Sequence, residues 1–237
     1  MPPLMALPGT LLDGRSLSSL LAQATAGGRH AQVLVLGQEP QLDAEVARLA
    51  AVAPEPAVWL GHSLGGIVAL HLAVRHPHCV AGLVLLAANA RAGAHSGAAR
   101  RAAQWQEARA HGLAALARAK LGPGYGLGAD DPLVQALADQ AEAVGLQRFA
   151  HQLAYASQRP GLLAPRRSLP VPLLALSAEH DALCPPAQSE ELAGLSPHAR
   201  HVCMPGAGHL FPMQAPAWAA GHLCHFLQRF SEPPPCA

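Results

Sequence analysis

Short apolar runs bounded by turn-forming residues recur six times along the chain. They cover residues 4–7, 31–36, 57–60, 83–87, 173–177 and 201–204. A run that is apolar on both faces is typical of a strand buried in a parallel sheet. We therefore expect six buried strands.

Between these runs, apolar residues recur at helical spacing. Leu42, Val46 and Leu49 mark one helix, and similar groups begin at Leu17, Leu64 and Leu223. Strands that alternate with helices are joined by right-handed crossovers, which place the strands side by side and the helices on both faces. The pattern predicts a single α/β domain over residues 1–237, with a doubly wound, mostly parallel sheet.

Residues 90–168 interrupt this alternation. Residues 91–120 are rich in Ala, Arg, Gln and Glu, and the next strand pattern begins only at Leu173. The cluster from Gly122 to Gly126 predicts a break between two helical pieces. We expect a helical lid over residues 90–168, inserted between core halves 1–89 and 169–237.

Composition narrows the class of protein. Hydrophobic residues make up 51% of the 237 residues and charged residues only 13%, so the chain can bury a large core. No apolar stretch reaches the roughly 20 residues of a membrane span, and the N-terminus lacks the basic start of a signal peptide. We expect a soluble, cytoplasmic protein that does not bind membranes.

The cysteines and histidines do not predict a metal site. The five cysteines have no close CxxC spacing, and the fourteen histidines form no His-Glu-x-x-His motif. We expect reduced thiols, no metal and no cofactor.

Charge is distributed unevenly. The net charge is +1, which argues against nucleic-acid binding, yet residues 90–168 hold ten of the sixteen basic residues and five of the fifteen acidic ones. The expected lid is therefore basic while the rest of the chain is acidic.

The strongest chemical motif is Gly61-His62-Ser63-Leu64-Gly65-Gly66, which follows one predicted strand and precedes a predicted helix. A serine at such a sharp turn needs small residues two positions away on either side, because side chains there would collide. Its hydroxyl then stands at a helix N-terminus, where developing negative charge is stabilised. Ser63 is the predicted nucleophile, and His62 is interpreted as a structural residue.

A serine nucleophile needs a base and an acid that orients the base. Asp181 follows the predicted strand 173–177, and His209 follows the strand 201–204 in a glycine-bracketed loop. The chain order Ser, Asp, His suits this kind of turn. Asp181 and His209 complete the predicted triad, with Glu179 as a competing acid.

An oxyanion hole requires two converging N–H groups. We expect one from Leu64, directly after the nucleophile, and one from Thr10 in the loop that follows the first strand. Among apolar residues, Trp105 on the underside of the lid and Phe211 after His209 are the candidates for substrate binding.

At the Pro8-Gly9-Thr10 loop, the Ser63 turn, Asp181 and Gly208-His209, the sequence resembles the α/β-hydrolase superfamily. Within it, the chain is similar to the lidded carboxylesterases that include pimeloyl-acyl-carrier-protein methyl ester esterases and enol-lactonases. The resemblance implies a small-molecule ester substrate and two-step hydrolysis through an acyl-enzyme, with thioesters and lactones as near variants. It also leaves open a lyase that uses the same triad for proton transfer, or a non-catalytic binding protein on this fold.

The basic lid suggests a partner. Arg91, Arg100, Arg101, Arg109, Arg118 and Lys120 could meet an acidic acyl carrier protein. The alternative is a solvated helix face with no partner.

Overall fold

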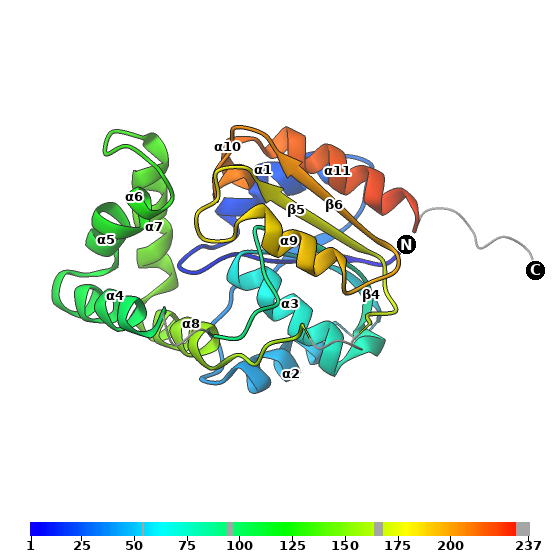
Figure 1. Ribbon diagram of the computed structural model, residues 1–237, viewed down its shortest axis with the longest axis horizontal. Helices are drawn as coiled ribbons and strands as arrows, with labels where there is room; N and C mark the ends of the chain where they lie inside the picture. Colours follow the sequence, from blue (N-terminus) through cyan, green and yellow to red (C-terminus); the bar gives the residue numbers. More distant parts are fainter. Residues whose placement is uncertain (54, 94–96, 164–167, 231–237) are drawn as a thin grey trace, which may run out of the picture.

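Six parallel strands form one sheet in the order β2-β1-β3-β4-β5-β6 (Figure 1). The computed structural model describes residues 1–53, 55–93, 97–163 and 168–230. The strands are β1 (Leu4–Leu7), β2 (Ala31–Val33), β3 (Ala57–His62), β4 (Val80–Leu86), β5 (Leu173–Ala178) and β6 (Ala199–Met204). All six predicted strands are confirmed, although β2 ends at Val33 rather than at residue 36.

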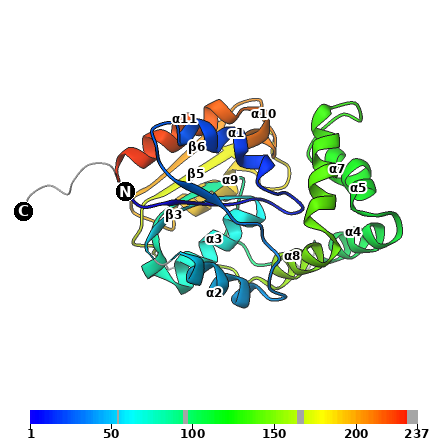
Figure 2. The same cartoon turned by 180° about the vertical axis from the view of Figure 1, so that it is seen from behind.

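Helices cover both faces of the sheet. Helices α1 (Arg15–Ala24) and α11 (Pro216–Gln228) lie on one face, and α2 (Leu42–Val52), α3 (Leu64–Arg75) and α9 (Pro186–Ala193) lie on the other (Figures 1 and 2). Two short helices, η1 (Pro77–Cys79) and α10 (Phe211–Gln214), complete this part. Successive strand residues point to opposite faces, so both faces must be apolar to be covered.

Strand β3 illustrates this two-sided burial. Val58 and Leu60 pack with the buried residues of α1 and α11, whereas Trp59 packs with those of α2 and α3. All three side chains are fully buried. The continuous apolar runs of the sequence are therefore the signature of a sheet between two helical layers.

The segment between β4 and β5 is helical. It contains α4 (Ala98–His111), α5 (Leu113–Leu116), a π-helical turn η3 (Ala117–Leu121), α6 (Gly122–Gly124), α7 (Pro132–Val144) and α8 (Leu146–Gln158). We call these helices the insertion. The assignment of residues 90–168 as a lid on a single domain stays a prediction.

The predicted break at residues 122–126 is confirmed, since the helical run ends at Gly124 and the next helix, α7, begins at Pro132. Gly122–Gly124 forms the short helix α6 directly after η3, with Pro123 in its only turn. The chain turns just after Tyr125, at Gly126, whose φ is 80°. The break between α4 and α5 lies at Gly112, with φ 87°.

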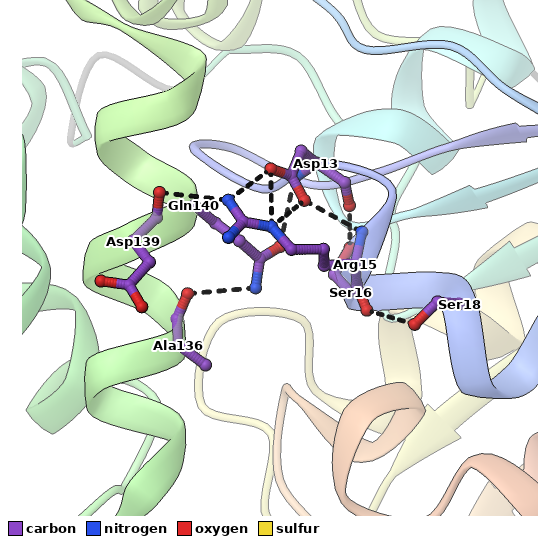
Figure 3. A network of polar contacts seen from close by, with 7 residues as sticks. All are labelled: Asp13, Arg15, Ser16, Ser18, Ala136, Asp139 and Gln140. Carbon is purple, nitrogen blue, oxygen red and sulfur yellow. Dashed lines mark hydrogen bonds and ion pairs between the residues drawn. The ribbon is translucent and has the colours of Figure 1, made fainter.

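The insertion is fastened to the loop that follows β1. Leu11 and Leu12 of that loop belong to the same buried apolar cluster as Leu137 and Phe149 of the insertion. Figure 3 shows the polar side of this contact. The Asp13 amide donates to Gln140 Oε1 at 3.2 Å, and Arg15, paired with Asp13 at 2.7 Å, donates to the carbonyl of Asp139.

Across the described ranges, no helix combines the length and apolar character needed to cross a bilayer.

Candidate active site

Ser63 lies at the turn between β3 and α3. Its φ is 52° and its ψ is −116°, a backbone conformation that non-glycine residues rarely adopt and that persists only where surrounding contacts enforce it. The Ser63 amide donates to the carbonyl of Leu86 at 2.8 Å. A Cβ at Gly61 would collide with the backbone of Gly65, and one at Gly65 would collide with the carbonyl of Leu7. The two glycines are therefore required by close backbone approach.

The structure brings the three predicted triad residues together. His209 Nε2 lies 3.0 Å from Ser63 Oγ, and His209 Nδ1 lies 2.8 Å from Asp181 Oδ2. The three residues follow the carboxyl ends of β3, β5 and β6, which meet at the same edge of a parallel sheet. A proton on Nδ1 that is donated to the carboxylate leaves Nε2 free to accept the serine proton.

Asp181 is held as a carboxylate. Its Oδ1 accepts from the amides of Leu183 and Cys184 at 2.8 and 2.9 Å. Burial by itself raises the pKa of Asp181, but the hydrogen bond and charge of His209, together with the two amides, lower it by more, so the net shift is downward. The competing acid, Glu179, is exposed and accepts from the amide of Gly206 instead.

His62 links the serine turn to the histidine loop. Its Nε2–H donates to the backbone carbonyl of His209 at 3.0 Å. Burial, reinforced by the nearby His209 ring, lowers the pKa of His62 to about 3, so the ring is neutral at ordinary pH. Its Nδ1 is buried with no hydrogen-bond partner among the described residues. The bond from His62 to the His209 carbonyl therefore supports the interpretation of His62 as a structural residue.

The two residues predicted for the oxyanion hole lie beside the serine. Thr10, Ser63 and Leu64 line one cavity, and a Cβ at Gly9 would lie 3.3 Å from the Cβ of Ser63. Leu64 is the first residue of α3, so its amide has no acceptor within the helix. The Thr10 amide has no acceptor in the described part of the chain. Their role stays a prediction that this placement supports.

Gln152 supports the Thr10 loop from the insertion, and sequence reasoning missed it. The side chain is fully buried on α8, accepts from the amide of Leu11 at 2.9 Å and donates to the carbonyl of Leu36 at 3.0 Å. Leu11 has a φ of 57°, so Gln152 stabilises an unfavourable backbone conformation directly after Thr10. A single glutamine in a helical pattern carries no signal of this contact.

The cavity above Ser63 has a volume of about 240 Å³. Its apolar wall includes Ile67 of α3 together with Leu121, Phe149 and Leu153 of the insertion. Among the described residues that line it, neither Trp105 nor Phe211 is present. The Trp105 ring lies against that of Phe149, with centroids 6.4 Å apart, and Phe211 is fully buried against Trp218. The substrate-binding role predicted for these two residues has no direct contact to support it.

Tyr125 is a second residue that sequence reasoning missed. Its ring stacks on the ring of His209, with centroids 5.3 Å apart and planes 12° from parallel. Burial raises the pKa of Tyr125 to about 12, so the phenol is neutral. The predicted helix break therefore contains the side chain with which the insertion covers the base.

Among the described residues, one group of three side chains has potential metal-ligand atoms close together. Asp181, Cys184 and His209 offer ligand atoms within 4.8 Å of one another. Burial, followed by the charge of Asp181, raises the pKa of the Cys184 thiol to about 12, whereas a metal requires the thiolate. Asp181 and His209 also already bond each other. These residues do not fit a metal ion well.

The basic residues predicted to meet a carrier protein divide into separate groups. Arg100, Arg101 and Lys120 line the cavity. Arg91 pairs with Glu191, and Arg118 donates to Gln135. Carrier docking stays a prediction.

Comparison with known proteins identifies the family of the chain. The family described as "Alpha/beta hydrolase family" matches residues 7–222. The pimeloyl-[acyl-carrier protein] methyl ester esterase of Xanthomonas oryzae pv. oryzae is 32% identical over 179 residues, which cover 69% of this chain and 67% of that protein.

Solved structures share the fold. A thermophilic esterase from Thermogutta terrifontis matches with a TM-score of 0.79 and 22% identity, over 97% of this chain and 90% of that one. The enol-lactonase from Burkholderia xenovorans LB400 matches with a TM-score of 0.75 and 24% identity, over 96% and 92%. The resemblance drawn from the sequence and the predicted fold class are both confirmed.

Proposed function

The chain belongs to the alpha/beta hydrolase family, and from that premise we propose that it is a serine esterase that cleaves a carboxylic ester, or a related thioester or lactone, through an acyl-enzyme on Ser63. The observation that carries this proposal is the hydrogen-bonded chain from Ser63 Oγ through His209 to Asp181, with distances of 3.0 and 2.8 Å. A nucleophile, a base and an orienting carboxylate within this reach are the parts that acyl transfer requires.

In the first step, Ser63 Oγ attacks the ester carbonyl while His209 Nε2 takes the hydroxyl proton. Asp181 holds the imidazole by its Nδ1–H and stabilises the cation that forms. The carbonyl oxygen becomes an oxyanion, which the amides of Leu64 and Thr10 would stabilise. Collapse of this intermediate expels the alcohol, which receives the proton from His209.

In the second step, His209 Nε2 takes a proton from water as the water attacks the acyl-enzyme. The acid leaves, and Ser63 recovers its proton from His209. The uncharged His62 contributes no competing cation beside the imidazolium, and its bond to the His209 carbonyl keeps the histidine loop in place.

We infer that the insertion acts as the lid of this site. The stacking of Tyr125 on His209 and the apolar wall of Leu121, Phe149 and Leu153 support the inference. An apolar wall suits the hydrocarbon part of an acyl group, since burial contributes roughly 0.8 kcal/mol per CH₂ group. The relative from Xanthomonas oryzae is named as an esterase for a pimeloyl-[acyl-carrier protein] methyl ester, and an ester of a medium-length acyl chain is consistent with such a wall.

The experiment that tests the proposal compares the natural protein with Ser63→Ala. We expect a fluorophosphonate probe to label Ser63, located by mass spectrometry of the labelled peptide, and short p-nitrophenyl esters to be hydrolysed. Both signals should disappear in the variant, while circular dichroism shows that the variant is folded.

Rapid quenching during p-nitrophenyl acetate turnover adds a direct readout, because an acetyl group should appear on Ser63. Turnover that persists in Ser63→Ala, or folded natural protein that neither labels nor hydrolyses, would contradict the proposal and favour the lyase or the non-catalytic alternative.

A further inference from the structure

The cavity above Ser63 is charged as well as apolar. Arg100, Arg101, Lys120 and Arg159 line it, and no Asp or Glu does so among the described residues. A second cavity of about 420 Å³ adjoins it and shares Asn89, Arg100, Arg101 and Arg159 as lining residues. Several like charges around one small cavity repel one another, and this repulsion is relieved when an anion binds between them.

Among the basic residues that line the cavity, Arg159 is held in place by hydrogen bonds to three acceptors. It is half-buried at the end of α8, and its Nε donates to the carbonyl of Arg91 at 3.0 Å. Its terminal nitrogens donate to the carbonyl of Ala156 at 2.7 Å and to Asn89 Oδ1 at 3.4 Å. All three acceptors are neutral. One N–H on each terminal nitrogen has no acceptor within the described ranges, which leaves two donors for a ligand.

The surroundings do not neutralise this charge. The ion pairs between described residues include Arg91 with Glu191 but none of Arg100, Lys120 and Arg159. Burial lowers the pKa of Arg159, as expected for a cation withdrawn from water without a carboxylate beside it. An anion bound beside this guanidinium would offset part of the desolvation cost of the charge.

We propose that the cavity binds an anionic group of the substrate, a carboxylate or a phosphate, against the guanidinium of Arg159 with Arg100 beside it. The inference rests on the proposed function, since it deepens that function by naming the substrate class as an ester with a second, negatively charged end. The scissile carbonyl would lie at Ser63, the hydrocarbon link along Leu121 and Phe149, and the anion at Arg159. A guanidinium suits both anions because its parallel N–H groups can bond two oxygens at once.

The first test compares esters that differ only in charge. Monomethyl adipate carries a free carboxylate, its monoamide is a neutral analogue of nearly the same shape, and a third methyl ester carries a terminal phosphonate. We expect kcat/KM to be about 10- to 100-fold higher for an anionic ester than for the amide, the range of a charged hydrogen bond. The order of carboxylate and phosphonate identifies which anion the cavity prefers.

The second test assigns the effect to residues. In Arg159→Gln the ratio of kcat/KM for the anionic and neutral esters should fall about tenfold or more, mainly through KM for the anionic ester. Arg100→Gln should give a smaller fall. Arg109→Gln is the matched control, because Arg109 is an exposed residue of the same helix as Arg100 and does not line the cavity. It should leave the ratio unchanged.

Equilibrium binding separates the failure of this inference from the failure of the proposed function. Adipate and inorganic phosphate are titrated into folded Ser63→Ala by calorimetry, with and without Arg159→Gln. Binding that requires Arg159 supports the anion site even if no ester is hydrolysed. Hydrolysis of neutral esters without any preference for charge, together with no anion binding, would overturn the inference and leave the esterase intact.

Discussion

The sheet supplies one side of the cavity and the insertion supplies the other, and the two sides differ in chemistry. On the sheet side, Ser63, Asp181 and His209 are joined by short hydrogen bonds between buried or half-buried groups. On the insertion side, Tyr125 lies over the base, and apolar side chains and arginines line the wall. In the proposed function, bond making belongs to the sheet side and substrate recognition to the insertion.

The difference teaches how one fold can serve many substrates. In the proposed mechanism the sheet edge fixes where an acyl group reacts, because backbone packing at Gly61 and Gly65 dictates the position of Ser63. The insertion contacts that edge through Tyr125 on His209, and Gln152 and the shared apolar cluster hold it to the loop after β1. Insertion residues outside these contacts can vary without disturbing the triad. Substitutions on the two sides should therefore have different effects.

The largest expected effect lies on the sheet side. Asp181→Asn keeps the shape of the side chain but removes the charge that holds the Nδ1–H tautomer of His209. We expect kcat for p-nitrophenyl acetate to fall by about 10⁴-fold. Glu179→Gln is the matched control and should stay within about twofold, since Glu179 bonds only a loop amide. Comparable losses in both variants would show that Asp181 is not the orienting acid.

The same substitution can be made on each side to compare packing. Gly65→Ala places a methyl group against the carbonyl of Leu7, and backbone cannot move aside cheaply, so we expect a loss of about 3 kcal/mol or more in unfolding free energy. Gly128→Ala, in the insertion, meets nothing within 4 Å, and its backbone is not left-handed. It should change stability by less than about 1 kcal/mol, toward stabilisation.

Urea unfolding of both glycine variants measures the contrast. Equal unfolding free energies would mean that the sheet side is no more tightly packed than the insertion, and would remove the physical basis of the comparison.

Lowering the pH should reduce the free energy of unfolding through protonation of His62. Its folded pKa of about 3 lies below the ordinary value of about 6.5, so the unfolded chain takes up the proton first. This contribution to stability is complete above pH 6.5 and is lost progressively as pH falls toward 3. Between pH 7 and pH 5 the loss is about 2 kcal/mol.

His62→Gln should remove this part of the pH dependence, measured by urea unfolding at both pH values. Asp181, whose pKa is lowered, loses its contribution only as pH falls below about 3.9, outside this interval. His201 and His222, whose pKa values are also lowered by burial, act equally in both proteins. His180→Gln, at an exposed position, is the control. An unchanged slope in His62→Gln would contradict the assignment.

The sheet side could be predicted from the sequence residue by residue, for a physical reason. A serine turn between a buried strand and a helix imposes glycines at fixed offsets, and parallel strands bring the loops of Asp181 and His209 to one edge. Each of these structural requirements produces a pattern within a short stretch of sequence. The four central strands are confirmed for the same reason, since burial on both faces makes their apolar runs continuous, whereas the edge strands β2 and β6 are only partly buried.

The insertion could be predicted only as a helical block. Gln152 meets Leu11 across 141 residues, and Tyr125 meets His209 across more than eighty, so no local pattern encodes either contact. The glycines and proline at residues 122–126 predict the helix break, whereas Tyr125 in the same cluster carries no local signal of its contact with His209. Trp105 does not line the cavity, whereas Phe149, whose ring centroid lies 6.4 Å from that of Trp105, does.

The smallest expected effect tests whether the insertion belongs to the catalytic apparatus at all. Tyr125→Ala removes the ring that stacks on His209 and admits water beside the imidazole, while leaving every hydrogen bond of the triad in place. We expect kcat to fall by about tenfold, an effect of the size measured for aromatic contacts, with the melting temperature nearly unchanged.

Tyr125→Phe distinguishes the ring from the hydroxyl. Phenylalanine keeps the stacked face, so its kcat should stay within about twofold of the natural protein if shielding is what matters. Equal losses of kcat in the two variants would assign the effect to the hydroxyl. No loss in either variant would show that the insertion lines the cavity but takes no part in catalysis. Because the ring stacks on the base, which acts in both steps, the loss should include deacylation, which single-turnover kinetics with p-nitrophenyl acetate can resolve.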